Sequence, residues 1–363
     1  MKKEFPHWLE MVGKVFKWIG IFLAAFIVLI LVIVLISRIV NASKTKISTE
    51  NGVQESAYVD LGGIEQYVEI RGEDSKNPII LVLHGGPGSP MTNISYYYQG
   101  GLEDEYTIVN WDQRGCGRTY YANQDLNELV DYLTDRFGQD KVIILGHSWG
   151  TVLGSQYAME HPEKVSAYIG VAQSINFLEG KVLATENSIR LADEDGNKEY
   201  VKNLSALSSE VFSAENYDDF DFISYANMCS LILQYPSCKD SMPPLQIMWT
   251  GMTSSDLSLS DIYWQKILNF NFERFLKLEY PLLEYYFVGF DIYEHGTEYE
   301  VPVYFISGDY DWTTPYPMVE KYYESVKAPD KDMILIKNTN HSPFLDNPDA
   351  FCAAVKSVLD DIK

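Results

Sequence analysis

The pentapeptide Gly146-His147-Ser148-Trp149-Gly150 has the residue types and spacing of a nucleophilic site. It follows a β-branched run at 141–145 and precedes a stretch of helical character at 151–160. In a G-x-S-x-G turn between a strand and a helix, the glycines allow close backbone approach and the serine hydroxyl is exposed above the sheet. We therefore predict that Ser148 is a nucleophile, and the alternative is a purely structural turn.

A serine hydroxyl reacts only when a base takes its proton and an acid orients that base. Of the six histidines, only His341 lies in a loop after a late strand, where sites in parallel sheets gather. We predict His341 as the base, the alternative being a surface-loop histidine. Asp311 is the predicted acid because it lies further into its loop than Asp309, which is typical of a turn residue. The other histidines are His7, His84, His147, His161 and His295.

The oxyanion of a tetrahedral intermediate needs two backbone N–H donors, for which the pattern predicts Gly86 and Trp149. Acyl transfer of this kind needs no cofactor. The four cysteines form no C-x-x-C pair and have no histidine at metal spacing, so no metal site is predicted. Cys229 and Cys238 could form a disulfide in an exported protein.

Alternating strand and helix patterns predict a mostly parallel sheet. Strands are expected at 77–83, 106–111, 141–145, 165–172, 301–307 and 333–337, after an opening hairpin at 56–71, with helices at 126–137, 151–160 and 348–362. The alternation fails between Gln173 and Tyr299, where the sequence is aromatic and irregular. This segment is predicted to be a helical cap, 173–299, inserted between two core parts, 47–172 and 300–363.

The segment Trp18–Ile36 is 19 residues long, contains no charge, and nearly spans a hydrocarbon layer of about 30 Å. We predict an N-terminal tail at 1–17 and an uncleaved transmembrane anchor at 18–40. The alternatives are a signal peptide cleaved near Val40-Asn41-Ala42 and a buried core helix. Four lysines precede the segment and three basic residues follow it, which favours a single-pass protein with its catalytic domain outside the cytoplasm.

Residues 47–363 hold 21 Lys and Arg against 49 Asp and Glu, a formal charge of −28. Such a surface repels nucleic acid and disfavours binding to anionic lipid, so no nucleic-acid partner is predicted. A solubilising surface explains this acidity, although it could also attract cationic substrates.

The chain resembles the proline iminopeptidase family of α/β hydrolases over residues 55–172 and 300–360. The resemblance rests on five motifs: His84-Gly85-Gly86-Pro87-Gly88, Asp112-Gln113-Arg114-Gly115-Cys116-Gly117-Arg118, the Ser148 pentapeptide, Gly308-Asp309-Tyr310-Asp311 and Asn340-His341-Ser342. It implies an α/β-hydrolase fold, a Ser148-His341-Asp311 triad and an aminopeptidase that removes N-terminal residues, often proline. It also implies that cap glutamates bind the free amine of the substrate, with Glu284 as the candidate.

Three functions remain open from the sequence. The first is hydrolysis of a peptide or small acyl substrate by an aminopeptidase. The second is an esterase, lipase or other amide hydrolase with the same triad, and the third is a non-catalytic binding domain tethered to the membrane. The membrane is the other expected partner, and the sequence gives no indication of the oligomeric state.

Overall fold

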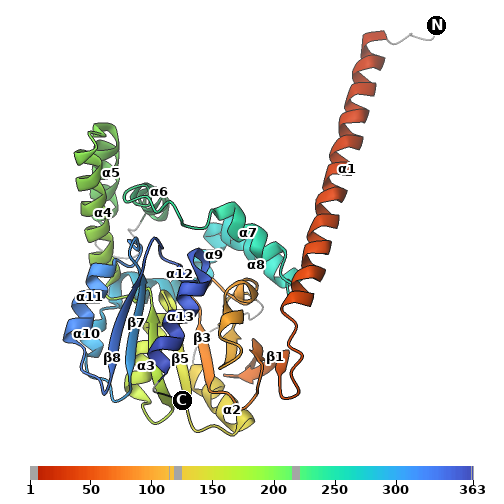
Figure 1. Cartoon of the computed structure of the whole chain (residues 1–363). Coiled ribbons are helices and arrows are strands. Elements are labelled where there is room, and N and C mark those ends of the chain that lie inside the picture. The colour runs from red at the N-terminus through yellow and green to blue at the C-terminus, as the bar shows by residue number, and fades with distance from the viewer. Residues whose placement is uncertain (1–6, 114, 118–124, 215–220, 361, 363) are drawn as a thin grey trace.

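A computed structural model shows a twisted sheet with helices on both faces, a group of cap helices, and one long helix that projects from the body (Figure 1). The structure describes residues 7–113, 115–117, 125–214, 221–360 and 362. Two arginines of the family motifs, Arg114 and Arg118, lie outside these residues.

One eight-stranded sheet, in the order β1-β2-β4-β3-β5-β6-β7-β8, forms the centre of the fold. Its strands are β1 (Val53–Leu61), β2 (Ile64–Gly72), β3 (Ile79–Leu83), β4 (Thr107–Trp111), β5 (Val142–His147), β6 (Val165–Val171), β7 (Val303–Gly308) and β8 (Lys331–Ile336). β1 pairs with β2 and β2 with β4 in antiparallel fashion, and every other pair is parallel. The mostly parallel sheet expected from the sequence is confirmed.

Successive side chains of a strand point to opposite faces of the sheet, and a hydrophobic core lies on each face. On one face, side chains such as Leu81 and Ile144 pack with α2 (Leu126–Phe137), α3 (Trp149–Glu160) and α11 (Tyr316–Ser325). On the other face, neighbours such as Ile80 and Ile143 pack with α13 (Pro348–Leu359). Because both faces are covered, the carboxyl ends of the parallel strands are the edge left for loops that carry function.

The segment between β6 and β7 is more regularly helical than its sequence indicates. Its helices are α4 (Phe177–Glu194), α5 (Lys198–Val211), α6 (Phe222–Ile232), α7 (Pro244–Met252), α8 (Leu259–Phe270), α9 (Phe272–Glu284), η4 (Tyr285–Gly289) and α10 (Ile292–His295). Side chains that accept a hydrogen bond from a first-turn N–H begin several of them, including Asn176, Asn197, Asp221 and Ser258. These N-caps were the sequence signal for helix starts in this segment.

The long helix α1 (His7–Lys44) contains the apolar segment, and its described part from Met11 onward is long and apolar enough to cross a membrane. Figure 1 shows it leaving the body beside α8. The helix extends past the apolar residues, and the Thr45 carbonyl that follows it accepts a hydrogen bond of 2.5 Å from Arg71 Nη2 in β2. The lower end of α1 is therefore joined to the sheet.

The same Arg71 side chain forms a buried ion pair, with Nε 2.7 Å from Glu103 Oε1. Arg71→Met leaves the Glu103 carboxylate buried without its cation, so the free energy of unfolding should fall by about 3–5 kcal/mol in urea titrations of detergent-solubilised protein. Arg136→Met, which removes an ion pair with Glu55 near the surface, should cost at most about 1 kcal/mol. Equal losses in the two variants would contradict a structural role for the buried pair.

Candidate active site

Ser148 lies at the tip of the turn between β5 and α3, with backbone angles φ 52° and ψ −119°. Such angles are unfavourable for a residue with a side chain and persist only where the surrounding structure enforces them. Close backbone packing on both sides of the turn holds Ser148 in this conformation. A Cβ atom at Gly150 would collide with the Leu83 carbonyl oxygen, and one at Gly146 would lie 2.5 Å from the Gly150 oxygen.

The structure brings Ser148, His341 and Asp311 together from three separate loops. His341 Nε2 lies 3.0 Å from Ser148 Oγ, and His341 Nδ1 lies 3.0 Å from Asp311 Oδ2 and 3.2 Å from Oδ1. These are hydrogen-bond distances, in the order hydroxyl, imidazole, carboxylate. Ser148 follows β5, Asp311 follows β7 and His341 follows β8, so parallel pairing places all three at one edge of the sheet.

The Asp311 carboxylate is fully buried and is held by its own loop. The backbone N–H groups of Thr313 and Thr314 donate to Oδ1, and the Thr314 hydroxyl donates to Oδ2 at 2.9 Å. Burial by itself would raise the pKa of Asp311, but the charge of His341 and these hydrogen bonds hold it below its ordinary value. Asp309 instead accepts a hydrogen bond from Asn338 N, at 2.7 Å, within the loop.

His147 has a supporting position that sequence reasoning did not identify. Its Nε2 lies 3.0 Å from the backbone carbonyl oxygen of His341. Burial, reinforced by the nearby His341 charge, lowers the pKa of His147 to about 3, so the ring is neutral at pH 7. The neutral ring donates its Nε2 hydrogen to that carbonyl and fixes the loop that carries the imidazole base.

The glycine loop after β3 passes beside Ser148. A Cβ atom at Gly85 would lie 3.1 Å from the Ser148 Cβ, and Gly86 has a φ of +122°, which favours glycine. Trp149, the other predicted oxyanion donor, is the first residue of α3, where helix N–H groups have no partner within the helix. Both predicted donors therefore lie in segments adjoining the serine.

Two side chains fix the conformation of this glycine loop. His84 Nδ1 lies 2.8 Å from the Gly85 oxygen, and His84 Nε2 accepts a hydrogen bond from Gln113 N. From the cap, Trp264 Nε1 of α8 donates to the Gly88 carbonyl at 2.8 Å. The loop is thus held by the sheet on one side and by the cap on the other.

The cap presents a buried glutamate to this loop, and it is not the residue singled out from the sequence. Glu284 is exposed at the end of α9, whereas Glu279, five residues earlier, is only 2% exposed. A Cβ atom at Gly115 would lie 2.9 Å from Glu279 Oε1, and one at Gly88 would lie 3.6 Å from its Cδ. Among the described residues Glu279 Oε1 has no hydrogen-bond partner, and burial raises the pKa of Glu279 to about 8.

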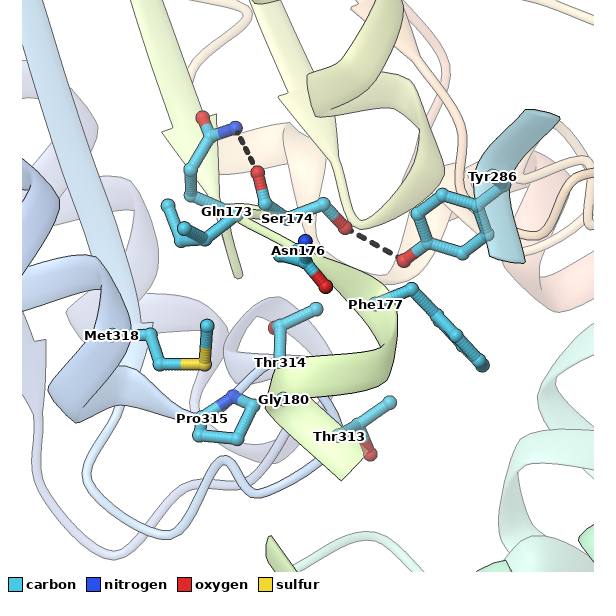
Figure 2. Close-up of a pocket in the computed structure, with 11 residues that line it drawn as sticks. Gln173, Ser174, Asn176, Phe177, Gly180, Tyr286, Thr313, Thr314, Pro315 and Met318 are labelled. Atoms are coloured by element: carbon cyan, nitrogen blue, oxygen red, sulfur yellow. Dashed lines mark hydrogen bonds between the residues drawn. The ribbon is translucent and has the colours of Figure 1, made fainter. Parts of the chain in front are cut away.

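A small pocket adjoins the loop that holds Asp311. Figure 2 shows Tyr286 pointing toward Ser174, with their hydroxyl oxygens 2.7 Å apart, and the loop at Thr313 and Thr314 on the opposite wall. Tyr286 also packs edge-on against Trp149, with ring centroids 5.3 Å apart. Tyr286 of η4 therefore covers the serine turn.

All four cysteines are free thiols, and this includes Cys229 and Cys238. Cys116 is buried, with Sγ 3.2 Å from His84 Nε2, and burial raises the pKa of its thiol well above the ordinary value. Within the described part of the chain, no group of three or more His, Cys, Asp or Glu residues is arranged to hold a metal ion.

Comparison with known proteins gives consistent matches. Residues 78–348 match the family described as alpha/beta hydrolase fold. The chain is 25% identical to the probable aminopeptidase YbaC of Bacillus subtilis, over 81% of this chain and 92% of the relative. It is also 25% identical to the proline iminopeptidase PfmaB of Pestalotiopsis fici, over 84% of this chain and 99% of the relative.

Solved structures share the fold at lower identity. The proline iminopeptidase of Mycobacterium smegmatis superposes with a TM-score of 0.58 and 19% identity, covering 85% of this chain and 98% of that one. A bacterial membrane phospholipase A superposes with a TM-score of 0.53 and 15% identity, covering 97% of this chain and 98% of that one.

The contact between Gly150 and Leu83 leaves no room for a side chain. Gly150→Ala should therefore lower the free energy of unfolding by about 1–3 kcal/mol through overpacking, measured by urea titration. Gly100→Ala is the matched control, because a Cβ atom there has no neighbour within 4 Å, and its stability should stay within about 0.5 kcal/mol of the unmodified chain. A Gly150→Ala protein as stable as this control would contradict the packing described for the turn.

Proposed function

Because the chain belongs to the alpha/beta hydrolase fold family, we propose that it is a membrane-anchored serine hydrolase of the proline iminopeptidase type. It releases N-terminal residues from peptides through an acyl-enzyme. The observation that carries this proposal is the hydrogen-bonded order of Ser148, His341 and Asp311 beside a cap that buries a glutamate.

In the proposed mechanism, Ser148 Oγ attacks the carbonyl carbon of the substrate while His341 Nε2 takes the hydroxyl proton. Asp311 keeps the imidazole in the tautomer that presents Nε2, and stabilises the imidazolium that forms. The N–H groups of Gly86 and Trp149 stabilise the oxyanion. His341 then protonates the leaving amine, and a water molecule repeats the sequence to release the acyl group. The chain's own residues supply every group that this reaction needs.

The aminopeptidase assignment is supported by Glu279. An N-terminal amine is cationic, and a buried carboxylate with an oxygen that has no partner among the described residues is the group expected to bind it. Glu279 contacts both the Gly88 and Gly115 segments, and the first of these continues the loop that passes beside Ser148. A charge at this place would fix the substrate's amino end a short distance from the scissile bond. The similarity to relatives named aminopeptidase and proline iminopeptidase supports the same substrate class.

We further propose that α1 is an uncleaved anchor. Arg38 Nη2 donates to the carbonyls of Ser255 and Leu257, both at 3.0 Å, and Asn41 Nδ2 donates to the Thr253 carbonyl at 2.9 Å. Cleavage after Ala42 would remove both side chains from the folded domain. The weak excess of basic residues before the apolar segment favours a catalytic domain on the outer side of the cell membrane.

A fluorophosphonate probe tests the proposed nucleophile, because it reacts covalently with an activated serine. The purified full-length protein should be labelled, and Ser148→Ala should not. Ser155→Ala, which removes a buried hydroxyl two turns further along α3, is the control and should label like the unmodified chain. No labelling of the unmodified chain, or equal labelling of Ser148→Ala, would favour the non-catalytic binding domain.

Glu279 predicts a pH-dependent preference for amine substrates. As its pKa is raised to about 8, the carboxylate that binds ammonium forms as the pH rises through that value. For proline β-naphthylamide, Glu279→Gln should lower kcat/KM by about 10- to 100-fold, the effect expected for one hydrogen bond to a charged group, mainly through KM. The pKa of the substrate amine is the same whichever protein is assayed. The difference between the pH profiles of kcat/KM for the unmodified chain and for Glu279→Gln therefore reports the titration of Glu279.

Two controls separate this peptidase proposal from the esterase alternative. Glu284→Gln, at the exposed position, should behave as the unmodified chain does, and an acyl ester without an amine should be cleaved equally by all three proteins. Ester turnover without any cleavage of the prolyl amide would exclude the peptidase and favour an esterase, lipase or other hydrolase.

A further inference from the structure

Two cap helices present an apolar face to the outside of the molecule. On α7, Leu245, Met248 and Trp249 are exposed, and on α8, Leu259, Ile262 and Tyr263 are exposed. Both sets follow the spacing i, i+3, i+4, so each forms one stripe along its helix. We call these six residues the outer cap face.

Helix α7 reverses the usual amphipathic arrangement. The buried side of α7 carries Thr250 and Gly251, which are small, while its exposed side carries the large apolar residues. The sequence of α7 contains no charged residue, although the chain as a whole has a formal charge of −23. A large exposed apolar surface without charges marks a contact with a partner or a membrane.

The outer cap face lies next to the end of α1. The loop between α7 and α8 accepts the hydrogen bonds from Arg38 and Asn41, and Tyr96 donates to the Thr250 carbonyl in α7 at 2.9 Å. Figure 1 shows α7 and α8 between the other cap helices and the lower end of α1, on the side from which α1 rises. Within the described part of α1, the most apolar stretch of the helix has no residue that is buried by protein.

We propose that the outer cap face lies in the interfacial layer of the lipid bilayer that α1 crosses. This inference rests on the proposed anchoring by α1. The apolar segment ends at Ile36, and Arg38, only two residues further, is bonded to the loop between α7 and α8. The boundary of the hydrocarbon layer therefore falls beside these two helices.

The residue types fit a lipid interface better than a protein partner. Trp and Tyr prefer the headgroup level, where an apolar ring meets a polar edge, and Trp249 and Tyr263 occupy one helix each. The acidic remainder of the domain repels anionic headgroups, so contact through uncharged apolar side chains is the mode open to this protein. The outer cap face also lies near the end of α1, whose exposed apolar side chains would be covered by lipid if it crosses the membrane as proposed.

Lipid contact at the outer cap face would occur close to the glycine loop of the candidate active site. The exposed stripe of α8 lies on the side of that helix opposite to Trp264, which is buried and donates to Gly88 in the glycine loop. An α-helix with its side chains is about 10 Å across, so only the width of one helix separates the glycine loop from the proposed lipid surface. The bilayer would thereby support the segment that positions Gly86.

The proposal is tested with an environment-sensitive dye on single cysteines in the full-length protein, reconstituted in phosphatidylcholine vesicles. The background is Cys229→Ser with Cys238→Ser, since Cys116 and Cys352 are buried. Leu259→Cys and Ile262→Cys report the outer cap face. Ile27→Cys in α1 is the positive control, and Asp135→Cys, exposed on α2, is the negative control.

Lipids with a doxyl quencher near the headgroup should remove about half of the emission from positions 259 and 262, as expected for apolar side chains that insert just below the headgroups. Position 135 should be unaffected, and circular dichroism should show equal folding of all variants.

Quenching at 27 without quenching at 259 and 262 would overturn the proposal while leaving the anchor intact. Position 27 is at the middle of the apolar segment, so it is measured with lipids that carry the doxyl group deep in the acyl chain, and absence of quenching at 27 by these lipids would overturn the anchor itself. Blue-shifted emission at 259 and 262 without quenching would show that a protein, such as a second copy, covers this face, and would also overturn the proposal.

Discussion

The close backbone contact between Gly150 and Leu83 is the constraint on which the site depends. It presses the start of α3 against the end of β3, and this leaves Ser148 in a conformation that few residues adopt. The strained turn is held because β5 lies in the middle of the sheet, between β3 and β6, with both faces covered. Parallel pairing of the strands then brings distant parts of the chain to the serine, as it does for His341, which is 193 positions away.

Sequence reasoning located residues well where their position follows directly from strand order. Ser148, Asp311 and His341 each come just after a strand that the sequence reveals by its apolar run, and parallel strands end at one edge. The central strands were found for the same reason. The helix α11 was not predicted, although Val319 and Tyr322 are buried on one of its faces. Its sequence is rich in tyrosine and charge, so the helical period is weak.

The cap was less predictable because its register depends on tertiary contacts. Glu279 and Glu284 lie on the same helix, and only the packing of α9 on the glycine loop decides which one is buried. His147 illustrates the same limit, since its partner is a backbone carbonyl in a loop nearly two hundred residues away. No local pattern encodes such a contact. The exposed apolar stripes of α7 and α8 also look like ordinary amphipathic helices until the structure shows which side faces outward.

The segment between α1 and the sheet is short, and several hydrogen bonds hold it to the domain. Only residues 45–52 separate the end of α1 from β1, and the Thr45 carbonyl, Ile47 N–H and Thr49 hydroxyl all hydrogen-bond to the domain. Even fully extended, eight residues would reach less than about 30 Å, and these contacts shorten that reach. With α1 in a membrane, as we propose, this short link would hold the catalytic residues at a nearly fixed distance from the lipid. Substrate selection would then depend partly on position, because a scissile bond would have to reach that distance from the membrane, whatever its chemistry.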